Sequence, residues 1–210
     1  MSARELLERL HRELADVEQA IRAHRYLDAA PPAASLRAFA GEQHAIVGSD
    51  RRSFAHLAAR FPEPPAGDFF LGLAQGEGQA LERLLALAAS LGVGEDGLDA
   101  YRPMPGCQAY TAFVSWLALN GSRADLALAF LANLAAWGEN CRRLADALAG
   151  RCDTSFFEFF AEPAPGFEHQ ALAVADQGLA AGDPADRARR AARLLQAYEL
   201  MFWDTLADAL

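Results

Sequence analysis

The hydrophobic pattern of this chain constrains its fold more than any other feature of the sequence. No segment of any length alternates apolar and polar residues with a period of two, which is the pattern of a half-buried strand. Apolar residues instead recur every three to four positions, as they do in amphipathic helices. Alanine is very frequent while valine, isoleucine and threonine are sparse, and this bias also favours helix. We therefore expect an all-α protein without a sheet.

Capping and breaking residues divide the chain into helical segments. Ser2 with Glu5, and Ser122 with Asp125, form the starts of two of them, because each pair places a hydroxyl and a carboxylate three residues apart. Gly48-Ser49-Asp50 is expected to interrupt a helix that Ser35 begins. The predicted helices span residues 2–24, 35–47, 50–61, 68–91, 106–120, 122–149, 154–161 and 167–181, and a last one from residue 183, with Asp183 as its N-cap. With short loops and no internal repeat, residues 1–210 are predicted to form one helical bundle.

Three glycines lie inside the predicted helix over residues 68–91. Gly72, Gly76 and Gly78 each cost this helix roughly 1 kcal/mol relative to alanine. Either a close approach of another helix or space for a ligand would explain them. Dinucleotide binding would not, because no strand precedes the glycines.

Composition excludes several classes of function. The net charge is −9 without a basic stripe, so we expect no nucleic-acid surface. All 19 cationic residues are arginine, which excludes lysine Schiff-base chemistry and the usual pyridoxal-phosphate attachment. The start of the chain is charged and amphipathic rather than a signal peptide, and no apolar run approaches membrane-span length. Three cysteines without a CxxC spacing favour reduced thiols in the cytoplasm.

The C-terminal helix carries the strongest candidate for chemistry. One apolar face is expected to contain, on it or near it, Leu195, Tyr198, Met201, Phe202 and Leu206, and Glu199 lies beside it. A buried carboxylate there must be paired, hydrogen-bonded or raised in pKa, and a raised pKa is typical of a general acid/base in a pocket. Alternatively, Glu199 lies at the border of the face and contacts water or an arginine. The sequence leaves both interpretations open.

Several segments together resemble the TenA/thiaminase II family, within the heme-oxygenase-like all-α fold. The resemblance covers roughly residues 35–210, and its most specific part is the Tyr-Glu and Phe-Trp-Asp pattern on the last helix. The segments that carry it are Glu42-Gln43-His44, Pro103-Met104-Pro105, Ala109-Tyr110-Thr111, Ala129-Phe130-Leu131-Ala132-Asn133, Trp137-Gly138-Glu139 and Tyr198-Glu199-Leu200-Met201-Phe202-Trp203.

This resemblance implies a cytoplasmic homo-oligomer, a dimer or tetramer, that requires no metal and no cofactor. It also implies a central pocket for a thiamine-related pyrimidine, and in active family members this pocket hydrolyses an aminopyrimidine or thiamine. Glu199 matches the family's acid/base glutamate, Phe202 an aromatic beside the substrate ring and Tyr110 a pocket tyrosine. Trp137 stands where the family has another tyrosine.

Two positions depart from the family pattern. The alignment places Asn133 where the family has a catalytic cysteine, and Gln43 where it has an aspartate that holds the substrate. Asparagine cannot act as a thiolate nucleophile, and glutamine can hydrogen-bond a pyrimidine edge without carrying a charge. From the residues alone, Asn133 either contacts a ligand or ties two helices together, and each aromatic residue either lines a slot or packs in the core.

Two alternative functions remain open beside hydrolysis. A binding or regulatory protein would keep the pocket and lose the chemistry, as Asn133 and Gln43 suggest. Oxygenase chemistry, with iron or without a cofactor, occurs elsewhere in this fold. A di-iron site needs carboxylates and histidines at helical spacing, and Glu42 and His44 are two residues apart and thus on different helix faces. We therefore expect no metal site.

Overall fold

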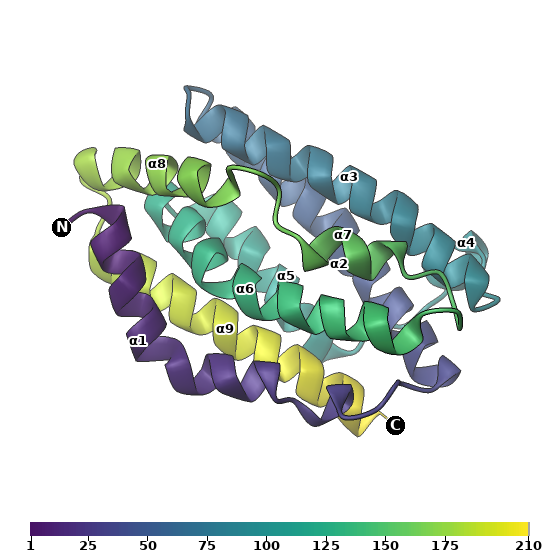
Figure 1. Cartoon of the computed structure of the whole chain (residues 1–210). Helices are drawn as coiled ribbons and strands as arrows, with labels where there is room; N and C mark the ends of the chain where they lie inside the picture. The colour runs from purple at the N-terminus through teal and green to yellow at the C-terminus, as the bar shows by residue number, and fades with distance from the viewer. Residues whose placement is uncertain (210) are drawn as a thin grey trace.

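The computed structural model describes residues 1–209, which form helices and no strand (Figure 1). The prediction of an all-α fold is confirmed. In this part of the chain, no helix combines the length and the apolar character that crossing a membrane requires. The elements are α1 (Ala3–Arg22), the 3-10 turn η1 (Arg25–Leu27), α2 (Ala33–Arg60), α3 (Ala66–Ser90), α4 (Glu95–Asp99), α5 (Pro105–Asn120), α6 (Arg123–Leu148), α7 (Ser155–Ala161), α8 (Phe167–Ala180) and α9 (Ala185–Asp208).

The long helices close into a ring. Helix α2 packs along α3, α3 contacts α7 and α8, and both of these contact α6. Helix α6 packs on α9, α9 on α5, and α5 returns to α2, while α1 covers α6 and α9 from outside (Figure 1). This closure surrounds an interior that is reached by side chains from every member of the ring.

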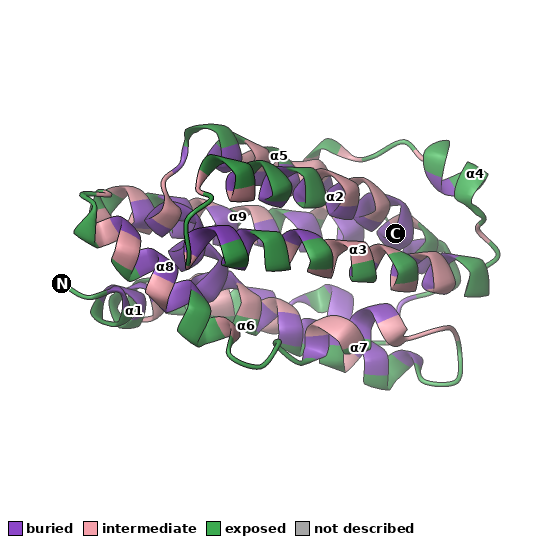
Figure 2. Cartoon of the chain, turned by 90° about the horizontal axis from the view of Figure 1, so that it is seen from above, coloured by how far each residue is buried: buried purple, intermediate pink, exposed green. Residues whose placement is uncertain are grey.

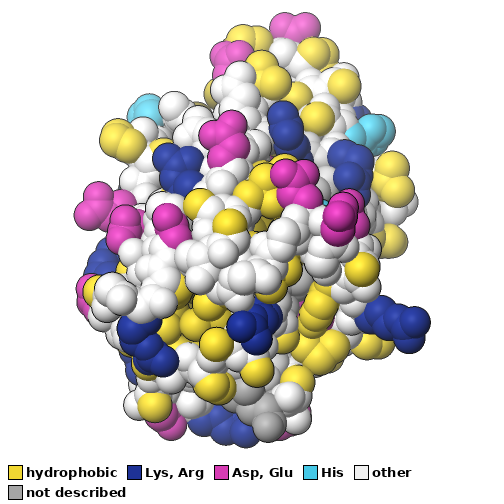
Figure 3. Space-filling view, turned by 90° about the vertical axis from the view of Figure 1, so that its right-hand side faces the viewer, with side chains coloured by type: hydrophobic (Ala, Val, Ile, Leu, Met, Phe, Trp, Pro, Cys, Tyr) yellow, Lys and Arg dark blue, Asp and Glu magenta, His cyan; other side chains and the backbone are white. Residues whose placement is uncertain are grey.

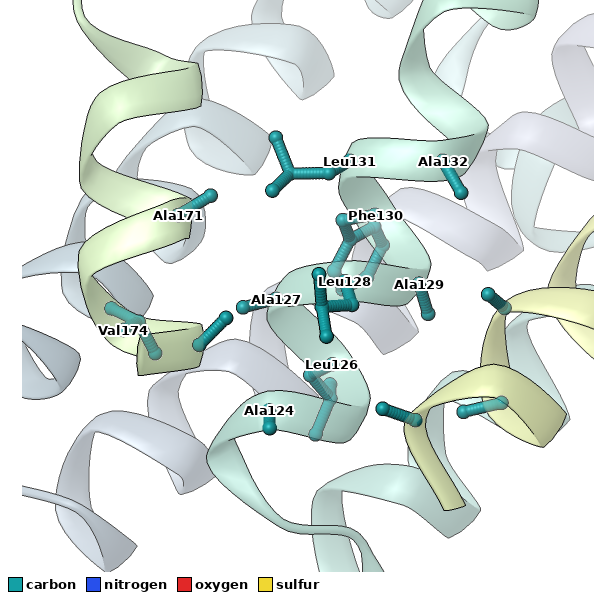
Figure 4. Packing of buried hydrophobic residues seen from close by; sticks show 14 of the residues in the cluster. Ala124, Leu126, Ala127, Leu128, Ala129, Phe130, Leu131, Ala132, Ala171 and Val174 are labelled. Carbon is teal, nitrogen blue, oxygen red and sulfur yellow. The ribbon is translucent and has the colours of Figure 1, made fainter. Parts of the chain in front are cut away.

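Helix α6 is buried on nearly all sides in its first half. Every residue from Ala124 to Asn133 is buried, and small side chains allow close approach of the neighbouring helices. In Figure 4, Ala127 points toward Ala171 and Val174 of α8, while Ala129 points toward α9 on the opposite side. Alanine provides the high helix propensity that such a helix needs without occupying much volume.

Two clusters of buried apolar side chains form the core. The first contains residues of α1, α3, α6 and α8, and the second residues of α2, α7 and the C-terminal half of α9. In Figure 2 the buried positions lie on the inner faces of the helices and the exposed ones on their outer faces. Tyr110 of α5 packs against both clusters, which places it at their junction.

Helix α2 is continuous, and the predicted interruption at Gly48-Ser49-Asp50 is wrong. The helix begins after Pro32, and Ser35, the predicted cap, instead donates a hydrogen bond to Tyr26 Oη at 2.8 Å. A glycine inside a helix costs only about 1 kcal/mol. Extensive packing along α3 outweighs that cost.

Smaller differences concern helix ends and short elements. The last helix starts after Pro184 instead of Asp183, and the Asp183 carboxylate accepts from the backbone N–H of Ala124, at the start of α6. Helix α3 begins two residues before Asp68, which lies in its first turn. The sequence pattern did not predict α4 or η1, because elements of five and three residues carry no periodic signal.

Charged side chains of both signs are interspersed on the end of the molecule that Figure 3 shows. Among the described side chains visible there, arginines alternate with carboxylates and with apolar groups, and no continuous basic surface forms. This face gives no support for nucleic-acid binding.

Candidate functional site

A cavity of about 430 Å³ lies inside the helical ring. Helices α2, α3, α5, α6, α7, α8 and α9 and the loop between α7 and α8 contribute to its wall. Members of both apolar clusters border it, so the cavity separates the two halves of the core. All six residues that the sequence singled out line this cavity, and they are Gln43, Tyr110, Asn133, Trp137, Glu199 and Phe202.

Glu199 is buried at the cavity wall. Only 2% of the residue is exposed, which resolves the two interpretations that the sequence left open. Oε1 accepts a hydrogen bond from Trp203 Nε1 at 3.2 Å, and Oε2 accepts one from Asn133 Nδ2. Burial raises the pKa of the Glu199 carboxyl to about 7, although the two hydrogen bonds act in the opposite direction. Both protonation states are therefore well populated at neutral pH.

A chain of hydrogen bonds connects three helices at this point. Tyr110 Oη of α5 donates to Asn133 Oδ1 of α6 at 3.2 Å, and Asn133 Nδ2 donates to Glu199 of α9. Asn133 is 2% exposed, so both halves of its amide are satisfied inside the protein. Asn133 thus ties the helices together and, in the same position, borders the cavity.

Aromatic rings form much of the remaining wall near Glu199. The Trp137 and Phe202 rings have centroids 6.0 Å apart and planes inclined by 69°. Trp137 meets Phe160 of α7 in a similar edge-on geometry, at 5.9 Å and 79°. A flat heterocycle would therefore stack on one of these rings and meet the edge of another.

Gln43 presents a free amide to the cavity. The residue is 4% exposed, yet its side chain forms no hydrogen bond with any other residue of 1–209. A buried amide without a protein partner requires water or a ligand. Gln43 is thus available to hydrogen-bond the edge of a ring.

Sequence reasoning missed two carboxyl groups that line the same cavity, Asp50 of α2 and Glu77 of α3. Asp50 follows Gln43 by seven residues, which is two helical turns, so one continuous α2 places both on one face. The wrong interruption at Gly48-Ser49-Asp50 concealed this relationship. Glu77 lies next to Gly76, which also lines the cavity.

Two of the helical glycines border open space. No atom lies within 4 Å of the position that a Cβ would occupy at Gly72 or Gly76, and both residues line the cavity. Gly78 is different, because a Cβ there would lie 3.3 Å from the Arg51 guanidinium carbon. Open space rather than a close helix approach therefore surrounds the Cβ positions of Gly72 and Gly76, and Gly72 itself is exposed.

The described side chains offer neither a metal site nor a cavity thiol. Within residues 1–209, no group of three or more His, Cys, Asp or Glu side chains is placed to hold a metal ion. None of Cys107, Cys141 and Cys152 lines the cavity. Burial raises the pKa of Cys107 and Cys141 well above the ordinary thiol value, so these two are poor sources of thiolate.

A sequence model of the TENA/THI-4/PQQC family matches residues 27–209. The chain belongs to this family. The match agrees with the resemblance that the last helix and the middle segments indicated, and it includes every one of the six candidate residues. No match was found among the curated proteins.

Solved structures of TenA homologues have the same fold. A TenA homologue from Pyrococcus horikoshii superposes with a TM-score of 0.79 at 18% identity, over 98% of this chain and 99% of the other. A TenA homologue from Pyrococcus furiosus gives a TM-score of 0.76 at 19% identity, over 96% and 99%. A domain of unknown function with a heme oxygenase-like fold from Shewanella denitrificans gives 0.73 at 15% identity, over 97% and 92%. The predicted heme-oxygenase-like bundle is thereby confirmed.

Proposed function

We propose that this TenA family member binds a thiamine-related aminopyrimidine in its cavity and hydrolyses it with Glu199 as the general acid/base. The observation that carries the proposal is the position of Glu199, a buried carboxyl with a pKa of about 7 in the wall of an aromatic cavity. Family membership supports this assignment, because Glu199 matches the acid/base glutamate in the resemblance.

The proton requirements of hydrolysis fit a single carboxyl of this kind. Cleavage of a carbon–nitrogen bond by water requires one proton to leave the attacking water and one to reach the departing nitrogen. Glu199 in its ionised form accepts the first proton, and the resulting acid delivers it to the leaving group. A pKa near the working pH keeps both steps accessible, and general acid–base catalysis of this type contributes about 10²–10⁴-fold in rate.

The remaining wall supplies recognition of a flat, nitrogen-containing ring. Trp137 and Phe202 offer a face and an edge, and each such aromatic contact contributes about 0.5–1.5 kcal/mol. The free amide of Gln43 has a donor and an acceptor for the ring nitrogens and the exocyclic amine.

Steady-state hydrolysis of aminopyrimidines and of thiamine tests the proposal. We expect turnover by the wild type and at least about a hundredfold slower turnover by Glu199→Gln. Equal rates for both proteins would show that Glu199 has no part in the chemistry. If the wild type showed no turnover, the hydrolytic function would be rejected, and binding without turnover would be the remaining candidate function.

The second candidate function is binding without turnover, and one observation favours it. Asn133 stands where the resemblance places a catalytic cysteine, and no cysteine lines the cavity. A protein of this kind would gain thermal stability from an aminopyrimidine and form no product. Product analysis of the same incubations therefore separates the two functions.

We also propose a cytoplasmic location. Cys107, Cys141 and Cys152 are all unpaired thiols, and this state is typical of proteins in a reducing compartment.

A further inference from the structure

We propose that Asp50 and Glu77 form a second subsite in the cavity, which binds a cationic group of the ligand such as a protonated amine or a quaternary ammonium. This inference rests on the proposed function insofar as both use the same cavity. It narrows the ligand to a flat ring that carries a positive charge, and it assigns a role to two residues that the hydrolytic scheme does not use.

The two carboxyl groups lack sufficient partners in the protein. Thr111 Oγ1 donates to Asp50 Oδ1, and no other residue of 1–209 donates to Asp50 Oδ2. Glu77 forms no hydrogen bond or ion pair with any residue in that range. Gln43, two turns before Asp50 on α2, is the third polar side chain of this wall without a protein partner. None of these three side chains has a fully enclosed polar atom without a partner, so their free atoms face the cavity, where water or a ligand can supply the hydrogen bonds.

The charge on the wall has one sign only. Four carboxyl side chains line the cavity, Asp50, Glu77, Glu162 and Glu199, and no lysine, arginine or histidine is among the described lining residues. Arg51 is adjacent to Asp50 in the chain, but its guanidinium lies beside Gly78 and pairs with neither carboxyl. Such a wall attracts a cation and repels an anion.

The pKa shifts of the two carboxyls are consistent with binding of a cation. Burial raises the pKa of Asp50 to about 7, and burial together with the nearby Asp50 charge raises the pKa of Glu77. The two carboxyls therefore hold a proton more readily than ordinary ones do. A cation between them would compensate both charges and release that proton. Phe54, one turn after Asp50, adds an aromatic face of the kind that attracts cations.

The carboxyl charges of the subsite and of Glu199 all act on one residue, Tyr110. The pKa of Tyr110 is raised by burial and, in addition, by the charges of Asp50, Glu199 and Glu77. Tyr110 lines the same cavity as Asp50 and Glu77, and it is linked to Glu199 through Asn133. One ligand can thus place its ring near Trp137 and Phe202 and its cation at Asp50 and Glu77.

Two pairs of ligands that differ mainly in charge test the subsite. The first pair is benzylamine and benzyl alcohol, and the second is the aminomethyl and hydroxymethyl forms of a 4-amino-2-methylpyrimidine. Affinities are measured by isothermal titration calorimetry at a pH at which the aliphatic amines are protonated. We expect the cation of each pair to bind the wild type at least about tenfold more tightly, because charge-assisted hydrogen bonds are stronger than neutral ones. Titrations in buffers of different ionisation enthalpy should show proton release for the cations only.

Substitutions test which side chains of the cavity cause the tighter binding of the cationic ligands. Glu77→Gln and Asp50→Asn should each reduce the cation's advantage severalfold, and the double variant should abolish it. Glu82→Gln, which removes one charge from an exposed position on α3, should keep it. Glu77 has no protein partner to lose, so the Glu77→Gln protein is expected to fold.

The other possible results show whether the subsite, the proposed hydrolysis or both are wrong. Equal affinities within both pairs, or an advantage that survives in the double variant, would overturn the subsite and leave the pyrimidine pocket intact. A cation preference without any hydrolysis would support the subsite and reject catalysis. Failure of all four ligands to bind would overturn both.

Discussion

Asn133 Nδ2 donates a hydrogen bond to Glu199 Oε2 across the contact between α6 and α9. The other half of the same amide accepts from Tyr110 Oη at 3.2 Å, so Asn133 stands between a potential acid and a phenol. With its N–H group directed at Glu199, the amide suits an ionised carboxylate, which only accepts hydrogen bonds. When Glu199 is protonated, a half-turn of the amide lets it accept from the carboxyl and donate to the phenol, because an amide has a donor on one side and an acceptor on the other. Asn133 can therefore stabilise both forms of the acid.

Replacing Asn133 tests this relationship. Asn133→Leu removes a hydrogen bond that lowers the pKa of Glu199, so we expect Glu199 to titrate at higher pH than in the wild type. Trp203 donates to the same carboxyl, and its fluorescence against pH provides the measurement, in a Trp116→Phe background that removes an exposed tryptophan. Asn140→Leu is the matched control, since Asn140 is also buried on α6 but donates to the Ile21 carbonyl. A midpoint that does not move in Asn133→Leu, or that moves equally in the control, would refute the coupling.

The stability of the protein should fall between about pH 5 and pH 8. The pKa of Glu199 is about 7 in the folded protein and 4.5 in an ordinary environment, so the folded state binds more protons in this interval. The stabilisation is complete below the lower value and is lost as the pH rises through the folded pKa, and it amounts to about 3 kcal/mol. Asp50 contributes in the same direction.

Urea unfolding at both ends of this interval measures the effect. We expect a clear loss of stability in the wild type and a smaller loss in Glu199→Gln, because glutamine does not titrate. Glu82→Gln, at an exposed position, controls for the change in net charge. The same loss in wild type and Glu199→Gln would show that Glu199 does not titrate in this range.

Filling the cavity from α3 should separate ligand binding from folding. A Cβ at Gly76 meets no atom within 4 Å, so Gly76→Ala should raise the free energy of unfolding by up to about 1 kcal/mol through helix propensity. Gly76→Leu should fold but lose at least about tenfold in ligand affinity, because its side chain enters the cavity. Calorimetry and thermal unfolding measure both effects. Gly41→Ala is the contrasting variant, since its Cβ would lie 2.4 Å from the Tyr101 ring and should destabilise the protein. Unchanged affinity in Gly76→Leu would place the ligand elsewhere.

An exposed aromatic pair indicates where copies of this chain would meet if it is a homo-oligomer, as the resemblance implies. Trp116 of α5 is 52% exposed and stacks on Phe113 with centroids 5.9 Å apart, and Leu119 nearby is 64% exposed. We expect a dimer or tetramer for the wild type and a smaller species for Trp116→Glu, measured by light scattering after size-exclusion chromatography. Arg102→Glu, a charge change at another exposed position, should keep the wild-type assembly. A monomeric wild type at micromolar concentration would contradict the prediction.

Most of the helices could be predicted because their signals are local. The capping box at Ser122 and Asp125 begins α6 as expected, and Gly150, with a φ of 75°, follows its C-terminal end. The wrong prediction for α2 arose because packing with another helix, and not the local sequence, decides its structure. Gly48-Ser49-Asp50 has the local composition of a turn, but burial against α3 keeps the helix continuous, and no local pattern reports that packing.

The candidate site was only partly accessible from the sequence for the same reason. Glu199 belongs to a distinctive segment on one helix, so it could be singled out from the sequence, although its burial could not be decided there. Asp50 and Glu77 lie on different helices and acquire their relationship only when α2 packs along α3. A continuous α2 would have placed Asp50 on the same face as Gln43, which is the one signal that could have revealed it.

The ionisation of Glu199 is the most direct test of this account, and ¹³C NMR of glutamate labelled at the side-chain carboxyl measures it. The signal that is missing from the spectrum of Glu199→Gln is thereby assigned to Glu199. We predict a titration midpoint near pH 7 that shifts when an aminopyrimidine is added, because the ligand occupies the cavity beside the carboxyl. A midpoint near the ordinary glutamate value of 4.5, unaffected by the ligand, would contradict both the buried acid and its proposed role.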